Sequence, residues 1–179
     1  MIPIAEAIKI VLAQTQMLPV ETVPLSESTN RILAEDLDFE RYVTLILAKL
    51  DPVSQSLVYA SAGHPSGYVL DGSGKPKALL KRTGVPLGLQ PNSPYAVAPP
   101  VHLLPGDIVL LVTDGIEESL SLENDFFGLQ RILEVARDNA KKSAREIMEA
   151  LIGAVRNFSK GRPQLDDLTV VVAKVNPSP

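Results

Sequence analysis

The chain has 179 residues, of which 45% are hydrophobic and 21% charged, and these proportions are typical of one globular domain of ordinary size. Its net charge of −4, without any block of Lys or Arg, argues against nucleic acid or an anionic membrane surface as a partner. Because Cys is absent and only two His are present, disulfides, thiolate zinc sites, cysteine nucleophiles and His-rich metal clusters are excluded.

The N-terminal part of the chain is predicted to be helical. Four apolar residues recur at helical spacing over residues 4–14: Ile4, Ile8, Val11 and Leu12. An extended piece over 21–25 leads to a second helix over 26–33, for which Ser26 is the expected N-cap. Since the first residues lack a basic n-region and no apolar run approaches the roughly 20 residues that span a bilayer, we expect a cytoplasmic protein.

From Tyr42 onward the pattern changes to short β-strands separated by turn residues. The predicted strands are 43–50, 56–61, 67–70, 78–80, 95–97, 101–104 and 108–112. The first two flank a turn at 51–54 and are expected to pair antiparallel, and the next two form a hairpin around the Gly-containing segment 71–76. The last two are separated by a Pro-Gly-Asp turn at 105–107.

The last third of the chain is predicted to be helical until a closing strand. Asn124 or Asp125 is expected to cap a helix whose apolar side comprises Phe126, Leu129, Leu133 and Ala136. Ser143 and Glu146 have the spacing of a capping box, which opens a second helix. The apolar stripe of this second helix comprises Ile147, Ala150, Leu151, Ala154 and Phe158, and such stripes usually face the core.

Gly161 ends the second helix, and residues 168–175 are predicted to form the final strand. Hairpins followed by two helices and a strand predict an α+β fold, in which the helices cover one face of an antiparallel sheet. Residues 176–179 are expected to form a flexible tail.

Two aspartates stand at the ends of apolar, β-branched runs. Asp114 follows one run in Val-Thr-Asp-Gly, and Asp166 precedes another in Gln-Leu-Asp-Asp-Leu-Thr. Carboxylates at the ends of neighbouring strands offer the hard oxygen ligands that Mg²⁺ and Mn²⁺ prefer. Simpler interpretations exist, because Asp before Gly115 is common in turns, and Asp167 competes with Asp166 for the ligand role or would cap a turn instead.

A set of fragments in this order resembles the metal-dependent serine/threonine protein phosphatases (PPM family) of the bacterial SpoIIE/RsbU branch. The fragments are Tyr42-Val43-Thr44-Leu45, Ala62-Gly63-His64-Pro65, Gly84-Val85-Pro86-Leu87-Gly88, Pro105-Gly106-Asp107, Thr113-Asp114-Gly115 with Glu118, Phe127-Gly128 and Asp166-Asp167-Leu168-Thr169. The resemblance implies a β-sandwich in which two metal ions, Mn²⁺ or Mg²⁺, activate a water that hydrolyses phosphoserine or phosphothreonine.

The same resemblance implies roles for individual residues. Asp114 and Asp166, with Asp167 as the alternative, would be metal ligands. His64 would orient a phosphate or a metal-bound water, although a His in a Gly-Pro turn is often only a hydrogen-bonding loop residue. Gly63 and Gly115 would let the backbone approach the site closely.

The chain departs from the family pattern in its N-terminal third. The Gly-Asp-type and Gly-Asp-Val-Ser-Gly segments that supply the bridging carboxylates of the family do not occur before Tyr42, where the family pattern has them. Residues 1–38 resemble instead the N-terminus of MoeA-type molybdopterin molybdenumtransferases, through Ile2-Pro3-Ile4-Ala5-Glu6-Ala7, Glu21-Thr22-Val23-Pro24-Leu25 and Arg31-Ile32-Leu33-Ala34-Glu35-Asp36-Leu37. We therefore interpret the chain as a chimera, with a MoeA-like segment (1–38), an incomplete phosphatase domain (39–175) and a tail.

Two functional hypotheses follow. The first is a hydrolase of the phosphatase family that acts on a phosphorylated regulatory protein of the anti-anti-sigma type, with weak or no activity because half of its metal site is missing. The second is a catalytically silent module for binding or oligomerisation. Removing the first strands of a two-sheet sandwich exposes an edge and an apolar face, so we also expect a homo-oligomer, or residues 1–38 packed in that place.

Overall fold

The structure, a computed structural model, describes residues 42–90, 93–164 and 166–176. The predicted helices over 4–14 and 26–33, the extended piece over 21–25 and the boundary at residue 38 lie outside these residues. The elements are β1 (Leu45–Asp51), β2 (Ser56–Ala62), β3 (Gly67–Leu70), β4 (Pro76–Leu80), β5 (Val101–His102), β6 (Ile108–Val112), α3 (Asp114–Glu117), α4 (Gly128–Asp138), α5 (Ala144–Ser159) and β7 (Val170–Lys174).

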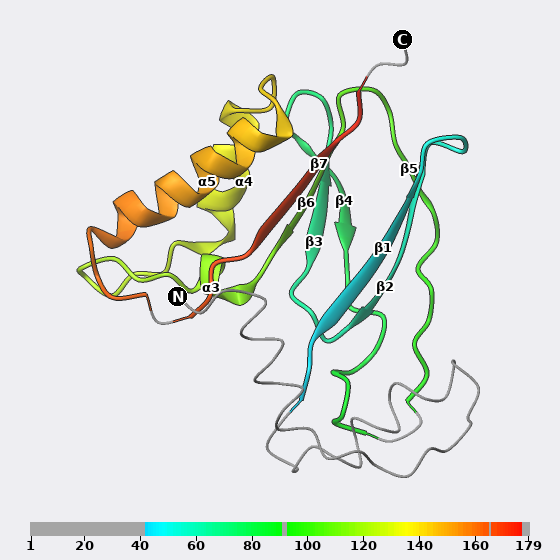
Figure 1. The fold of residues 1–179 in the computed structure, drawn as a ribbon, viewed down its shortest axis with the longest axis horizontal. Coiled ribbons are helices and arrows are strands. Elements are labelled where there is room, and N and C mark those ends of the chain that lie inside the picture. The colour runs from blue at the N-terminus through cyan, green and yellow to red at the C-terminus, as the bar shows by residue number, and fades with distance from the viewer. Residues whose placement is uncertain (1–41, 91–92, 165, 177–179) are drawn as a thin grey trace, which may run out of the picture.

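Three layers form the described part of the chain (Figure 1). A three-stranded sheet has the order β1-β2-β5, and a four-stranded sheet has the order β4-β3-β6-β7, with all ladders antiparallel. Helices α4 and α5 cover the face of the four-stranded sheet that points away from the other sheet. The predicted α+β fold, an antiparallel sheet covered by two C-terminal helices, is confirmed.

The two predicted hairpins are also confirmed. Strands β1 and β2 pair from Leu45 opposite Ala62 to Asp51 opposite Ser56. Asp51 stabilises the turn between them, because its Oδ1 accepts hydrogen bonds from the backbone N–H groups of Val53 (2.9 Å) and Ser54 (3.2 Å). The hairpin of β3 and β4 turns around Asp71, whose carboxylate accepts from Ser73 and Lys75.

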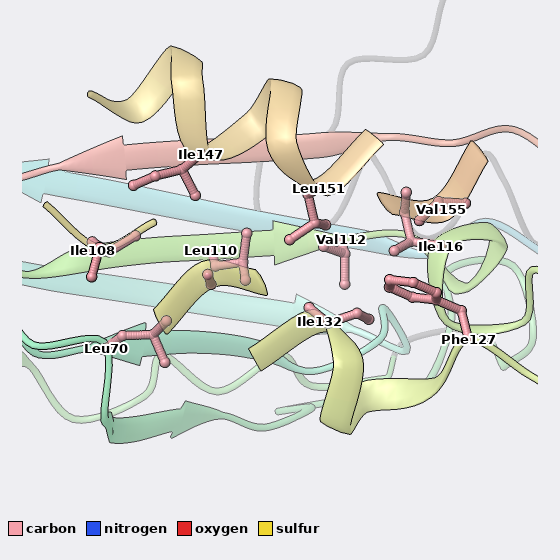
Figure 2. Packing of buried hydrophobic residues seen from close by; sticks show 12 residues of the cluster. Leu70, Ile108, Leu110, Val112, Ile116, Phe127, Ile132, Ile147, Leu151 and Val155 are labelled. Carbon is pink, nitrogen blue, oxygen red and sulfur yellow. The ribbon is translucent and has the colours of Figure 1, made fainter. Parts of the chain in front are cut away.

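Strand β6 lies in the centre of the molecule and is buried on both faces. Its even-numbered residues, Ile108, Leu110 and Val112, point toward the helices, where they pack with Ile132 of α4 and Leu151 of α5 (Figure 2). Val109 points to the opposite face, where it packs with Leu57 and Tyr59 of β2 between the two sheets. Because successive side chains of a strand point to opposite faces of the sheet, this one apolar run contributes to two separate hydrophobic clusters.

Helix α5 begins where the capping box predicted. Ser143 Oγ accepts from the N–H of Glu146, and the Glu146 carboxylate accepts from the N–H of Ser143 at 2.9 Å. The buried face of the helix carries Ile147, Leu151 and Val155, while Ala154 and Phe158 pack partly buried against the same core. Four of the five residues of the predicted stripe thus belong to this core, whereas Ala150 does not, and Val155 was not part of the stripe.

Several boundaries differ from prediction. Residues 95–97 form no strand, because Pro94, Pro99 and Pro100 surround them and cannot donate to a ladder; next to them, Ala98 N–H donates to the carbonyl oxygen of Tyr59. The predicted strand 101–104 is reduced to the two residues of β5.

The start of α4 was also predicted wrongly. It follows Phe127, not Asn124 or Asp125. Asn124 has a φ of +67° and lies in a turn, whose N–H groups at 123 and 125 donate to Ser121 Oγ. Consequently Phe126 is 60% exposed, and Phe127 takes its place in the core.

None of the helices formed by the described residues is long and apolar enough to cross a membrane.

Candidate functional site

The pairing of β6 with β7 brings the two predicted aspartates to the same end of the sheet. Val112 lies opposite Val170, so the chain leaving β6 and the chain entering β7 run side by side. Asp114 is the first residue of the short helix α3, and Asp166 lies four residues before β7. The fold therefore brings these two distant residues to the same end of the four-stranded sheet.

Thr113 and Gly115 hold the two segments together. Thr113 Oγ1 donates to the carbonyl of Asp167 at 3.0 Å and accepts from the N–H of Thr169 at 3.1 Å. Gly115 is buried, and a Cβ placed on it would lie 2.5 Å from the Asp167 carbonyl oxygen and 3.4 Å from the Cβ of Asp166. The close approach predicted for Gly115 is therefore an approach to the neighbouring Asp166–Asp167 segment.

Both aspartates are exposed, and each carboxylate accepts a hydrogen bond from the N–H group of the next residue. Asp114 Oδ1 accepts from the N–H of Gly115 at 3.0 Å, and Asp166 Oδ1 accepts from the N–H of Asp167 at 2.7 Å. Across 42–90, 93–164 and 166–176 no three His, Asp or Glu side chains gather to hold a metal ion. Since Mg²⁺ and Mn²⁺ need more oxygen ligands than a pair of aspartates provides, the described residues alone do not fit a complete metal centre.

Asp114 lines a cleft of about 630 Å³, which we call the Asp114 cleft. Gly63, Pro65 and Arg82 contribute to its lining, together with the acidic residues Glu117 and Glu118. Asp166 lines a different, neighbouring cavity of about 450 Å³, which shares Glu118 and Phe126 with the Asp114 cleft. The two candidate ligands thus stand at adjoining hollows in the surface.

His64 and Gly63 lie in the loop between β2 and β3. His64 is half-buried, and burial is the main reason why its pKa lies below the usual 6.5, with Arg82 lowering it further and Asp114 and the Val112 backbone opposing the shift. Gly63 has a φ of +67°, and a Cβ there would be 2.4 Å from Cγ of Pro86. Gly63 therefore allows the loop to pack against Pro86, and it also lines the Asp114 cleft.

Sequence reasoning did not single out Arg82 or Glu117 as members of this region. Arg82 lies just after β4, and its Nε donates to the carbonyl oxygen of His64 at 3.3 Å. A single exposed Arg after a strand belongs to no sequence motif that would predict a functional role. Its position near His64 is therefore visible only in the folded structure. The acidic pair Glu117-Glu118 after Asp114 was visible, but only Glu118 belonged to the resembling motif.

Comparison with known proteins identifies the family. The family model described as stage II sporulation protein E (SpoIIE) matches residues 5–176. The chain belongs to the SpoIIE family. Because the match begins at residue 5 and so includes residues 5–38, it gives no support to the resemblance of the N-terminal segment to MoeA-type enzymes or to the interpretation of the chain as a chimera.

Curated SpoIIE-family relatives are longer than this chain. Protein IcfG of Synechocystis sp. is 32% identical over 149 residues, which are 83% of this chain and 23% of IcfG. The phosphoserine phosphatase RsbU of Bacillus subtilis is 24% identical over 148 residues, 83% of this chain and 43% of RsbU. The chain thus spans less than half the length of either relative.

Solved structures confirm the fold. The SiaA-PP2C domain of Pseudomonas aeruginosa superposes with a TM-score of 0.65 at 25% identity, covering 74% of this chain and 52% of that one. The PP2C phosphatase domain of SpoIIE from Bacillus subtilis, with a fragment of its regulatory domain, gives a TM-score of 0.67 at 22% identity, covering 82% and 42%. The chain therefore has the PP2C-type fold of phosphatase domains.

Proposed function

We propose that this chain is a phosphatase-type domain that receives phosphoserine or phosphothreonine of a regulatory protein in the Asp114 cleft, with weak or no hydrolytic activity of its own. The observation that carries the proposal is the placement of Asp114 and Asp166 at the same end of β6 and β7, beside two adjoining cavities of which the Asp114 cleft is one. The name of RsbU, a phosphoserine phosphatase, supports the substrate class. A regulatory partner of the anti-anti-sigma type is part of the same proposal.

The expected weakness follows from the ligand count. Asp114 and Asp166, or Asp167 in its place, are the proposed positions for Mn²⁺ or Mg²⁺; one related SpoIIE structure is described as presoaked with Mn, and RsbX as a complex with magnesium. The described residues supply no third carboxylate to this pair, and the bridging motifs of the family do not occur before Tyr42. A divalent ion held by two aspartates and water binds weakly.

Calorimetric titration with Mn²⁺, paired with an assay on a chromogenic phosphate ester, tests the proposal. We expect binding only at millimolar Mn²⁺ and turnover close to background. Asp114→Asn should remove what binding there is, whereas Asp138→Asn, on the exposed side of α4, should not change it. Tight binding with metal-dependent turnover, both lost in Asp114→Asn, would show that the chain is a competent phosphatase and contradict the proposed weakness.

A second proposal concerns assembly, and it favours the alternative role as an oligomerisation module. In the described part of the chain, β2 is the one strand that pairs with β1, and the apolar residues Leu45 and Leu47 of β1 are exposed. We propose that a second copy of the chain covers this strand. The description of one SpoIIE phosphatase-domain crystal form as being without domain swapping indicates that related domains exchange segments between copies.

A further inference from the structure

Arg82 has a position in the Asp114 cleft that an ordinary surface arginine lacks. Among the described residues that line the cleft it is the only basic one, and three acidic residues, Asp114, Glu117 and Glu118, line the same cleft. A phosphoryl dianion entering a cleft with this acidic lining would be repelled unless a cation met it. Arg82 is the cation that the described lining provides.

The side chain of Arg82 is also held in place. Its Nε donates to the carbonyl oxygen of His64 at 3.3 Å, which ties the guanidinium to the loop that carries Gly63 and Pro65. The described residues give its two terminal nitrogens neither a hydrogen bond nor an ion pair. A planar guanidinium whose Nε is bonded to a loop carbonyl, and whose terminal N–H groups meet no partner among the described residues, offers the fork geometry by which Arg binds phosphate oxygens.

The pKa of His64 also connects Arg82 with Asp114. The pKa of His64 responds to Arg82 as well as to Asp114, so the three side chains share one electrostatic environment although they come from three separate segments. The alternative interpretation, an arginine that is merely solvated, explains neither the contact with His64 nor the position among acidic neighbours.

We propose that Arg82 contacts the phosphoryl group of the phosphorylated side chain in the Asp114 cleft and thereby determines the preference of this chain for phosphorylated partners. This inference rests on the proposed function, since it assigns a recognition residue to the same cleft. It requires no bound metal, because the charge-assisted bonds from Arg82 form with or without hydrolysis.

Binding of a fluorescent phosphoserine peptide to the full chain, measured by anisotropy without added metal, tests the inference. The peptide has neutral residues around its phosphoserine, and an unphosphorylated twin serves as reference. Arg82→Gln is expected to weaken binding of the phosphopeptide by about tenfold or more, with no change for the twin. Arg82→Lys should fall between, because it keeps the charge and loses the fork.

Lys81→Gln is the matched control, since it removes the same charge from the neighbouring exposed residue, which does not line the cleft. It should bind the phosphopeptide as the unmodified chain does, and circular dichroism melting should show all variants folded. Equal weakening by Lys81→Gln and Arg82→Gln would mean that overall charge attracts the peptide, and the inference would be wrong.

Two further outcomes separate the inference from the proposed function. If the unmodified chain binds both peptides equally, neither the proposed substrate class nor the role of Arg82 holds. If it prefers the phosphopeptide and Arg82→Gln keeps that preference, the proposed function stands and only the assignment of Arg82 fails.

Discussion

His64 interacts with one negative side chain, Asp114, and one positive side chain, Arg82. The pKa of His64 therefore tests whether these three side chains lie close together. Burial and Arg82 lower its pKa, while Asp114 raises it. We therefore predict that Asp114→Asn lowers the pKa of His64 further and that Arg82→Gln raises it, because each substitution removes one charge and leaves the other. NMR titration measures both, and a protein with two histidines gives few signals to assign. Shifts in the same direction for both variants would show that the three side chains do not interact as described.

Two glycines provide a matched pair of substitutions. Gly115→Ala places a Cβ 2.5 Å from the Asp167 carbonyl oxygen, so the Asp166–Asp167 segment has to move, and we expect a loss of about 1–3 kcal/mol in the free energy of unfolding. Gly153→Ala in α5 meets nothing within 4 Å and should gain about 0.5–1 kcal/mol, because Ala favours the helix. Urea denaturation distinguishes them, and equal stability of the two variants would contradict the close packing at Gly115.

For individual residues, the sequence predicted the place in the fold more accurately than the burial and the contacts of the side chain. Asp114 and Asp166 could be placed at one end of the sheet because they lie beside two apolar, β-branched runs, and those runs became neighbouring strands. Arg82 could not be placed, because its contact with His64 spans 18 residues and depends on two loops. The burial of Asp107 was equally invisible, since Pro-Gly-Asp predicts only a turn.

Asp107 links two elements of the four-stranded sheet. It is 2% exposed, it accepts the N–H of Leu104 at 2.8 Å, and it pairs with Lys77 of β4. We predict that Asp107→Ala lowers the free energy of unfolding by about 3 kcal/mol, because it leaves a partly buried ammonium and an N–H group without their partner. Denaturant titration measures the loss. Asp138→Ala removes an exposed ion pair with Arg137 and should have little effect, so equal losses would show that the burial of Asp107 does not matter.

Elements were predicted most accurately where local chemistry determines them. The capping box of α5 and the Asp51 turn depend on residues within four positions of each other, and both are present. The start of α4 depends on distant contacts instead: Phe127 packs against Phe158 with ring centres 5.4 Å apart, and Arg162 bonds to Asn124 in the preceding turn. These contacts override the capping preference of Asn124 and Asp125, which is a property of the local sequence alone.

Within the residues that the structure describes, the two sheets are covered unequally. Helices α4 and α5 protect the four-stranded sheet, whereas no described element lies on the outer face of the β1-β2-β5 sheet (Figure 1). On that face Leu45 is 45% exposed and Leu47 is 70% exposed. An apolar face next to an unpaired strand edge is the kind of surface through which chains associate.

If a second copy covers this face, Leu47→Lys should convert an oligomer into a monomer, because the new charge would be buried at the interface without a partner. Val53→Lys is the matched control, since Val53 is 93% exposed at the tip of the β1–β2 turn and its substitution should leave the mass unchanged. Light scattering after size-exclusion chromatography measures the mass of each variant over a range of concentrations. An unmodified chain that stays monomeric, with residues 1–38 resistant to proteases, would assign the cover to that segment instead. A monomer in which the same residues are freely cleaved would leave the face bare and contradict both forms of the expectation.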